Sequence, residues 1–392
     1  MASRSFASRL NALNRQLGKF PTTEALPPLP SEQTSPRDQA EQALSDELGG
    51  DLDPSGLIIR RQVFTDADQL AGHRVGRGLH RALRETFCTE PGRIAILDTE
   101  TTGLAGGVGT FAFLVGVLIC PKPPAPITLY QLLLTRINGE TSLLRQLCAY
   151  LDDVDTLITY NGKSFDLPLL LSRAQLHRVH LPIDFAHLDL VHPMRAAFRG
   201  RWSDCRLMTA ERQLLGLHRH DDIPGAEIPA VYQMWLRHCQ WNSLKRVIEH
   251  NAADLLALTI LPQPLADAIH SPQRRNANVA AGARWHLARN DREAALAHLL
   301  KHFERLSHSE EQLLAELARG HADAVGIWNK LAARDNTVAL LQLAKHFEHR
   351  KKDHALALRY AQRALAHQPH DPAHHHRIAR LSRKLDSLTH ST

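Results

Sequence analysis

The chain has 392 residues, of which 43% are hydrophobic, and carries a formal net charge of +6. This length is sufficient for two domains with a sizeable core. No apolar run approaches the ~20 residues of a transmembrane helix, which excludes a membrane partner. The five cysteines are scattered and form no CxxC pair. They argue against a disulfide framework and a structural zinc site, and they favour a reducing, cytoplasmic location.

The positive charge is concentrated in the last third of the sequence. Residues 273–392 contain 20 basic and 12 acidic residues, a net charge of +8, whereas the rest of the chain has a net charge of −2. A basic pI of 9.2 points to polyanionic partners. The distribution of charge places the surface for such a partner in the C-terminal third.

The first region, 1–55, combines a short helix with a linker. Residues 1–20 are basic, lack acids and place Phe6, Leu10, Leu13 and Leu17 at helical spacing. This pattern predicts an amphipathic helix, and a mitochondrial transit peptide has the same composition. Residues 21–54 are rich in Pro, Ser, Glu, Asp and Gly, and we predict a flexible linker there.

The second region, 56–265, alternates strands and helices. Five apolar segments have the length and composition of strands, namely 93–100, 111–119, 127–134, 156–160 and 185–190. Short connections make the first three antiparallel neighbours. Helical patterns at 140–151 and 164–177 separate the later strands. The prediction is an α/β domain with a mixed five-stranded sheet flanked by helices.

Two carboxylates stand at the end of the first of these strands. In Ile-Ala-Ile-Leu-Asp-Thr-Glu (94–100), Asp98 and Glu100 are two residues apart and therefore share one face of the strand. Like charges this close repel unless a cation or a proton lies between them. The pair alone is equally compatible with half a metal site and with a solvated acidic turn.

Further acidic residues occur at the ends of other elements. Asp166 follows the strand at 156–160 and begins a helix, where an acid also complements the helix dipole. His250 and Asp254 are four apart on one face of an apolar helix, an arrangement that is also common on helix surfaces. Four converging carboxylates require counter-charge. Two divalent ions, Mg²⁺ or Mn²⁺, would supply it and act on phosphoryl groups, with His250 supplying or orienting a general base.

Three motifs resemble those of the DnaQ-like (DEDD) 3′–5′ exonucleases, whose fold is ribonuclease H-like. They are Asp-Thr-Glu-Thr-Thr-Gly at 98–103, Asn-Gly-Lys-Ser-Phe-Asp at 161–166, and His250 with Asp254. The YprB-type ribonuclease H-like family is a closer match over 57–265. Leu-Ala-Gly-Gly at 104–107, Asp-Asp-Ile-Pro-Gly at 221–225 and His-Asn-x-x-Asp at 250–254 also resemble that family.

The resemblance implies Asp98, Glu100, Asp166 and Asp254 as metal ligands and His250 as the base. It implies a 3′–5′ exonuclease acting on DNA or RNA by a two-metal mechanism. A ribonuclease H-like endonuclease and a catalytically silent scaffold are the alternatives. Three residues separate His250 from Asp254, a spacing that the family's tyrosine subtype shows, whereas its histidine subtype has four. The acids at 221–222 either approach the site or cap a turn, and we favour the turn.

The third region, 272–392, is rich in Ala and Leu and predicts an all-α domain. Residues 343–369 resemble a tetratricopeptide helix pair, and a looser copy occupies 283–303. Such arrays bind peptides or proteins, and the positive charge also suits a nucleic-acid backbone. A protein partner and a nucleic-acid contact both remain open for this domain.

Overall fold

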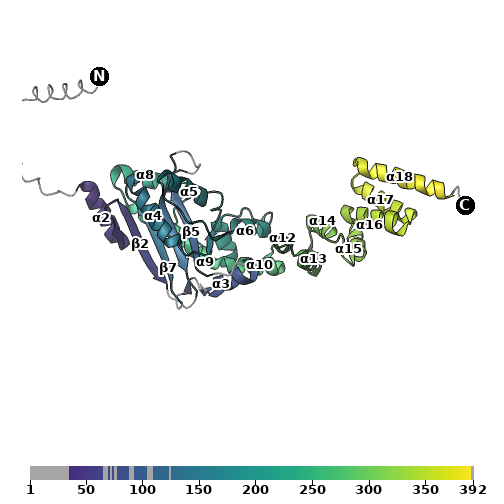
Figure 1. Cartoon of the computed structure of the whole chain (residues 1–392), viewed down its shortest axis with the longest axis horizontal. Coiled ribbons are helices and arrows are strands. Elements are labelled where there is room, and N and C mark those ends of the chain that lie inside the picture. Colours follow the sequence, from purple (N-terminus) through teal and green to yellow (C-terminus); the bar gives the residue numbers. More distant parts are fainter. Residues whose placement is uncertain are drawn as a thin grey trace, which may run out of the picture.

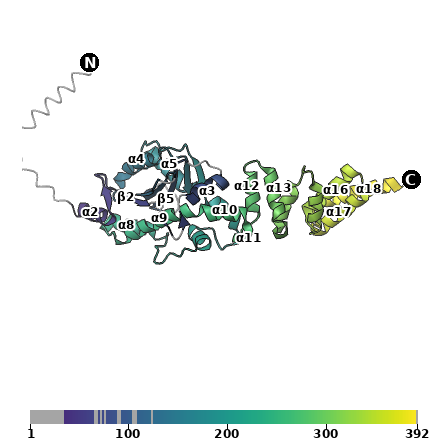
Figure 2. The same cartoon turned by 90° about the horizontal axis from the view of Figure 1, so that it is seen from below.

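The structure, a computed structural model, describes residues 35–64, 69–70, 73–74, 77–87, 92–103, 109–122 and 125–389 (Figure 1). The predicted helix within 1–20, the first part of the predicted linker and the Leu-Ala-Gly-Gly segment lie outside the described residues. An α/β part is followed by helices that extend away from it, so the described chain is elongated (Figures 1 and 2).

The main sheet has seven strands in the order β1-β2-β7-β6-β5-β8-β9, so the prediction of five was wrong. β5, β8 and β9 are parallel neighbours, and the other pairs are antiparallel. The strands are β1 Gly50–Leu52, β2 Leu57–Phe64, β5 Ile94–Thr101, β6 Ala112–Cys120, β7 Ile127–Leu134, β8 Thr156–Thr159 and β9 Ala186–Asp189. A separate hairpin joins β3 Gln69–Leu70 to β4 His73–Arg74.

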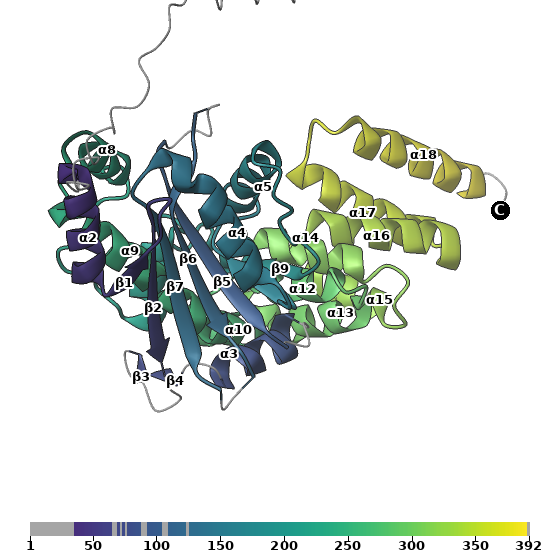
Figure 3. The ribbon, with the colours of Figure 1, turned by 60° about the vertical axis from the view of Figure 1, so that its left-hand side comes forward.

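The five predicted strands correspond to β5, β6, β7, β8 and β9, and β1 and β2 extend the sheet beyond β7 (Figure 3). β2 pairs with β7 along its whole length, from Leu57 opposite Leu134 to Phe64 opposite Ile127. Its apolar residues are interrupted by Arg60, Arg61 and Gln62, which hides the strand from a search for alternation. The fold remains a mixed α/β sheet with helices on both faces, as predicted.

The helices of the α/β part are short, apart from the central α9 Asn242–Ile260. The others are α2 Pro36–Leu48, α3 Arg77–Ala82, α4 Glu140–Leu151, α5 Asp166–Leu176, α6 Val191–Phe198, α7 Leu207–Ala210, α8 Ile228–His238, α10 Pro262–His270 and α11 Pro272–Arg275. Two short π-helices, η1 Leu83–Phe87 and η3 Glu211–Leu215, and one 3-10 helix, η2 Ile137–Gly139, complete this part.

The two faces of β5 belong to different parts of the core. Ala95 and Leu97 lie in one hydrophobic cluster together with the apolar residues of α4. Ile94 and Ile96 lie in another, together with Leu255 and Leu258 of α9. Because side chains alternate along a strand, the continuation of the second face past Ile96 points toward α9.

The linker predicted for 21–54 was wrong for its second half, where α2 forms. The Ser35 side chain accepts a hydrogen bond from the Asp38 backbone N–H (3.1 Å), and Pro36 occupies the first turn. This arrangement is a typical helix start. Buried Glu41 then accepts from Arg136 Nε (2.8 Å), which fixes α2 to the edge of the sheet.

The sequence shows no uninterrupted apolar run of transmembrane length, but the helical segment Asn242–His270, covering α9 and α10, is long and apolar enough to cross a membrane by length and mean composition alone. In the structure, 72% of the most apolar window is buried. Its apolar side chains pack against the sheet and α3, as core helices do. Burial therefore accounts for its composition.

The C-terminal region is helical throughout, as predicted. It comprises α12 Ala280–Leu287, α13 Arg292–Lys301, η4 Phe303–Arg305, α14 His308–Leu317, α15 Ala324–Ala332, α16 Thr337–His346, η5 Phe347–Lys351, α17 His354–His367 and α18 Pro372–Thr389. Successive helices pack on one another, and small residues such as Ala344, Ala357 and Ala361 lie where α16 and α17 meet. Its assignment to tetratricopeptide-like repeats stays a prediction.

Asn278 ties these helices to the α/β part. Its Nδ2 donates to the carbonyl oxygens of Ala196 (3.3 Å) and Arg199 (3.1 Å) at the end of α6. Arg201 Nε donates to Asn278 Oδ1 (2.9 Å), and the Asn278 backbone N–H donates to Ala197 O (2.7 Å). Four hydrogen bonds at one residue fix the start of the helical arm.

Candidate active site

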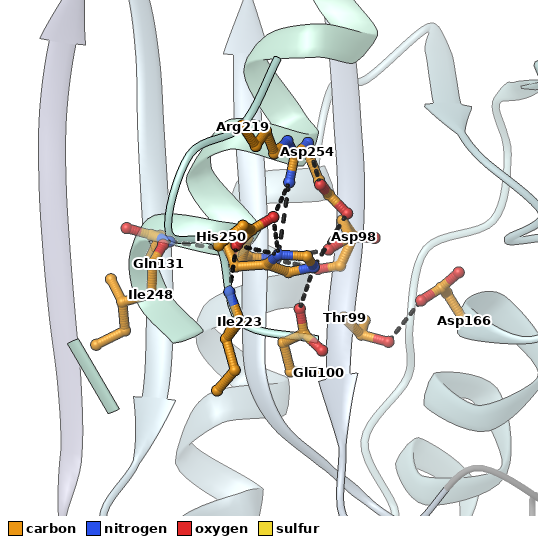
Figure 4. A network of polar contacts seen from close by, with 12 residues as sticks. Asp98, Thr99, Glu100, Gln131, Asp166, Arg219, Ile223, Ile248, His250 and Asp254 are labelled. Carbon is orange, nitrogen blue, oxygen red and sulfur yellow. Dashed lines mark hydrogen bonds and ion pairs between the residues drawn. The ribbon is translucent and has the colours of Figure 1, made fainter. Parts of the chain in front are cut away.

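The acidic pair lies where β5 leaves the core. Asp98 and Glu100 continue the face of Ile94 and Ile96, and both point toward α9 (Figure 4). The pairing with β6 shifts register between Glu100 and Thr101. Irregular pairing of this kind re-aims side chains and is frequent beside active sites.

A chain of buried amides holds Asp98. Asn251 Nδ2 of α9 donates to Asp98 Oδ2 (2.8 Å), and Gln131 Nε2 of β7 donates to Asn251 Oδ1 (2.9 Å) and to Ile248 O (2.7 Å). Arg60 Nη1 of β2 donates to Gln131 Oε1 (2.8 Å). The hydrogen bonds therefore run from the edge of the sheet to the carboxylate, and they orient it.

Gly116 makes room for this contact. It pairs with Asp98 across β5 and β6. A Cβ atom at Gly116 would lie 2.3 Å from Asn251 Oδ1 and 2.3 Å from Leu255 Cδ1. Glycine is the residue that lets α9 approach the sheet here, and the approach brings α9 side chains to the acidic pair.

His250 and Asp254 of α9 face the acidic pair, as their spacing predicted. His250 Nε2 lies 3.9 Å from Glu100 Oε1 and 3.8 Å from Asp254 Oδ2. The side chains of His250, Glu100 and Asp254 are 11%, 13% and 16% exposed. The structure thus collects Asp98, Glu100, His250 and Asp254 at one largely buried place (Figure 4).

Three residues that were not among the predicted site residues, Asp222, Arg219 and Glu211, complete this cluster. Asp222 Oδ1 lies 2.8 Å from His250 Nδ1, so the 221–225 loop reaches the site rather than merely capping a turn. Arg219 Nη2 lies 2.5 Å from Asp254 Oδ1, and its Nη1 lies 3.2 Å from Asp222 Oδ2. Glu211 of η3 accepts from Arg219 Nε (2.9 Å). One buried guanidinium therefore holds three carboxylates from three segments.

Asp166 lies apart from this group. It begins α5, and its Oδ1 accepts from Thr99 Oγ1 (2.5 Å). Thr99 points away from Asp98 and Glu100, because it occupies the intervening position of the strand. Figure 4 shows Asp166 on the far side of β5 from α9. The predicted convergence of four carboxylates is thus seen for three, and the fourth is close enough for its charge to act on them.

The electrostatics of the site oppose its own ionisation. Burial, followed by the charges of Asp254, Glu100 and Asp166, raises the pKa of Asp98 well above its ordinary value. Burial and the charges of Asp254 and Asp166 raise the pKa of Glu100 in the same way. Burial also tends to raise the pKa of Asp222, but His250 and Arg219 lower it overall. The single positive charge of Arg219 does not balance the negative charges of the carboxylates in the cluster.

The carboxylates suit a hard divalent cation by their chemistry. Carboxylate oxygens are the ligands of Mg²⁺ and Mn²⁺, and a cation would relieve the repulsion at Asp98 and Glu100. Within the described part of the chain, no group of three His, Cys, Asp or Glu residues is already arranged around one ion position. Arg219 occupies an oxygen of Asp254, and Thr99 occupies one of Asp166. The donor set fits, and the second carboxylate oxygen of each of these two residues is not used in these contacts.

A cavity of about 690 Å³ adjoins the acids. Glu100, Asp166 and Asn161 contribute polar groups to its lining, and Phe165 and Leu169 contribute apolar ones. The Phe165 side chain is 59% exposed, which is unusual for a large aromatic residue. Exposed aromatic rings beside a polar pocket suit stacking of a nucleobase.

Residues 95–266 of the chain match the ribonuclease H superfamily and form a domain of that superfamily. A nuclease-like hydrolase that acts on nucleic acid is the class of function this superfamily indicates. The chain belongs to the family of the uncharacterized protein YprB of Bacillus subtilis (strain 168), with which it is 31% identical over 311 residues, 74% of each chain.

A solved structure with a related arrangement is the family B DNA polymerase of Pyrobaculum calidifontis. The identity is 16% and the TM-score 0.34, and the match covers 51% of this chain and 29% of that one. The chain therefore spans less than a third of the polymerase.

Sequence signals for the additional residues differ in strength. Gln131 is a polar residue in the otherwise apolar strand Ile-Thr-Leu-Tyr-Gln-Leu-Leu-Leu, and Asn251 adjoins His250 in a quoted motif. Both were therefore detectable. Arg219 and Glu211 belong to no periodic pattern, and only the fold brings them beside Asp254.

Proposed function

We propose that the protein is a divalent-metal-dependent nuclease that removes nucleotides from the 3′ end of nucleic acid. The observation that supports this most is the meeting of Asp98, Glu100 and Asp254 in a largely buried place with too little counter-charge. Burying such a cluster costs stability, and a functional role would explain why the cost is tolerated. The ribonuclease H superfamily domain supplies the class of substrate.

Asp98, Glu100 and Asp254 would hold the metal ions, Mg²⁺ or Mn²⁺, with Asp166 as a further ligand. When bound, two such ions activate a water and stabilise a leaving oxygen at a phosphoryl centre. Asn251 keeps Asp98 oriented through its Nδ2–H. The cavity beside Glu100 would take the terminal nucleotide, with its base against Phe165.

His250 is placed to receive a proton. When its Nδ1–H donates to Asp222, its Nε2 carries the lone pair and faces Glu100 and Asp254. A histidine fixed in this tautomer accepts a proton at Nε2, from the water that attacks phosphorus. Asp222 is then a positioning residue. This arrangement gives His250 a role despite a spacing to Asp254 that differs from the histidine subtype.

The primary test is hydrolysis of 5′-labelled single- and double-stranded DNA and RNA with Mg²⁺ or Mn²⁺. We expect a ladder of products shortened from the 3′ end, no activity with EDTA, and none from Asp98→Ala. Asp184→Ala, which removes an exposed acid outside the site, is the matched control and should be as active as wild type. Equal activity of Asp98→Ala and wild type would contradict the proposal.

A circular substrate separates exonuclease from endonuclease action. The proposed enzyme leaves a circle intact, whereas a ribonuclease H-like endonuclease opens it. The same superfamily domain supports the second form, so cleavage of the circle would replace the exonuclease by the endonuclease.

The role of Asp222 has its own comparison within the loop. Asp222→Asn should lower kcat tenfold or more with little change in KM, since it loosens His250 without touching the cavity. Asp221→Asn is the matched control, because Asp221 contacts Arg246 only through its backbone oxygen. Equal kcat values for the two variants would remove Asp222 from the mechanism.

A further inference from the structure

The strongest surplus of positive charge lies at the C-terminal end. Residues 345–389 contain ten Lys and Arg and four Asp and Glu, a net charge of +6, which equals that of the whole chain. They comprise the end of α16 together with η5, α17 and α18, the last elements of the helical arm (Figure 1). The rest of the protein is therefore neutral overall, and its excess charge is confined to one end.

Much of this charge gathers around a single buried acid. Glu348 of η5 is fully buried, and Arg377 Nη1 (2.9 Å), Arg380 Nη2 (2.8 Å) and Lys384 Nζ (2.9 Å) of α18 surround its carboxylate. Their side chains are 17%, 35% and 40% exposed. One carboxylate balances one of the three cations, so two positive charges remain at the surface.

Neighbouring cations add to this surplus. Arg350 and Lys351 follow Glu348 in η5, and Arg383 lies one helical turn beyond Arg380. All three are exposed, and none forms an ion pair within the described residues. We define Arg350, Lys351, Arg377, Arg380, Arg383 and Lys384 as the C-terminal basic face.

The positive charges at this end of the arm affect the pKa of a nearby lysine. Lys345 of α16 precedes Glu348 by three residues. Burial and the charges of Arg377 and Arg319 lower the pKa of Lys345. Arg377 therefore repels a neighbouring cation although it contacts Glu348.

We propose that the C-terminal basic face binds the phosphate backbone of nucleic acid, independently of its sequence. Guanidinium and ammonium groups at neighbouring surface positions match the repeated charge of a backbone. Residues 1–272 have a net charge of −2, so the excess positive charge that would attract a polyanion lies in the C-terminal third. This inference takes its class of ligand from the proposed function, but it concerns binding alone.

The test measures binding of the full chain without hydrolysis. Fluorescence anisotropy in EDTA gives the Kd of labelled single-stranded and duplex oligonucleotides at several salt concentrations. The triple variant Arg350→Gln/Lys351→Gln/Arg383→Gln removes exposed cations without ion pairs. The matched control, Arg61→Gln/Lys122→Gln/Arg145→Gln, removes the same charge from exposed positions of the α/β part.

The C-terminal triple variant should weaken binding about tenfold or more at moderate salt. It should also reduce the slope of log K against log salt on duplex DNA by about 3, since each lost phosphate contact contributes about 0.9. The control should change the Kd less than twofold. Because no metal is present, the result is independent of whether Asp98→Ala abolishes hydrolysis.

Two outcomes would overturn the proposal. One is equal nucleic-acid binding by wild type and the C-terminal triple variant. The other is loss of binding to a polyglutamate peptide with nucleic-acid binding retained, which would make the face a docking site for an acidic protein. Circular dichroism establishes that each variant is folded. Arg383→Gln alone is a milder second variant, because Arg383 bonds only to Ala379 O of its own helix.

Discussion

Asp98 is a residue whose ionised form opposes the stability of the fold. Its carboxylate is buried beside Glu100 and near Asp254, and it receives one hydrogen bond, from Asn251. A carboxyl group whose pKa is raised by folding is less stable when ionised in the folded state than in the unfolded one. Ionised Asp98 therefore lowers the stability of the metal-free protein at neutral pH.

Replacing Asp98 by Asn should accordingly stabilise the metal-free protein and inactivate it. The amide removes one charge from the cluster and still accepts from Asn251. We expect the Tm to rise by about 2–4 °C, equivalent to about 1 kcal/mol in a domain of this size. Mn²⁺ should raise the Tm of wild type more than that of Asp98→Asn. Differential scanning fluorimetry with and without Mn²⁺ measures both effects, and a lower Tm for the metal-free variant would contradict them.

Gly116 offers a second test at the scale of one residue. In Gly116→Ala the new Cβ meets Oδ1 of Asn251, a side chain held in place by a hydrogen bond from Gln131 to its Oδ1 and by one from its Nδ2 to Asp98. We expect loss of about 1–3 kcal/mol of stability, typical of overpacking. Activity should fall at least tenfold, because Asp98 loses its donor. Gly78→Ala is the control, since nothing lies within 4 Å of its Cβ position. Full activity of Gly116→Ala would show that Asn251 does not position Asp98.

The sequence contained the acids of the site but not their arrangement. The two-residue spacing of Asp98 and Glu100 and the four-residue spacing of His250 and Asp254 follow from the geometry of a strand and a helix, so these pairs were predictable. The pairing of Asp222 with His250 and of Arg219 with Asp254 depends on how a loop and a π-turn fold back on α9. No local rule contains that information.

At the scale of elements, local pattern was sufficient where a strand is buried on both faces. The segment Ala112–Cys120 is apolar throughout, and it forms the central strand β6. β1 has only three residues, and β2 is polar in its second half because it lies near the sheet edge. Such strands exist because a neighbour pairs with them, which the sequence of the segment does not show.

The packing of α18 depends on the ion pairs of buried Glu348, and these ion pairs should weaken when Glu348 is protonated. Burial tends to raise the pKa of Glu348, but hydrogen bonds from Lys384 and Arg380 and the charge of Arg380 lower it to about 2. A carboxyl with a lowered pKa stabilises the fold above its ordinary value of 4.5. That stabilisation is lost as the pH falls from 4.5 toward about 2.

Glu348→Gln should therefore destabilise the helical arm at pH 7, by about 3 kcal/mol, because three cations lose their buried partner. The difference from wild type should shrink below pH 4.5. Urea unfolding at pH 7 and at pH 3 measures it. Glu304→Gln, which removes a carboxyl with 89% exposed side chain at 4.0 Å from Arg334, should leave stability unchanged. A pH-independent difference for Glu348→Gln would contradict the ion-pair explanation.

At the scale of the molecule, the acidic site and the C-terminal basic face lie in different parts of an elongated chain (Figure 1). The hydrogen bonds of Asn278 fix the start of the arm on α6, and each later helix packs on its predecessor. The two places are therefore held apart at a set separation rather than joined by a loose tether.

Because this separation is fixed, the affinity for nucleic acid should depend on the length of the oligonucleotide. An oligonucleotide shorter than the gap contacts one place at a time, whereas a longer one contacts both and gains from effective concentration. We expect the Kd in EDTA to fall in a step as length increases from about 10 to about 60 nucleotides. In the C-terminal triple variant this step in the Kd should disappear. A smooth dependence of the Kd on length in the wild type would contradict the prediction. If the protein shortens nucleic acid as proposed, it should release a strand once the remainder is too short to contact both places, and the length of its final products should then reflect the length of the helical arm.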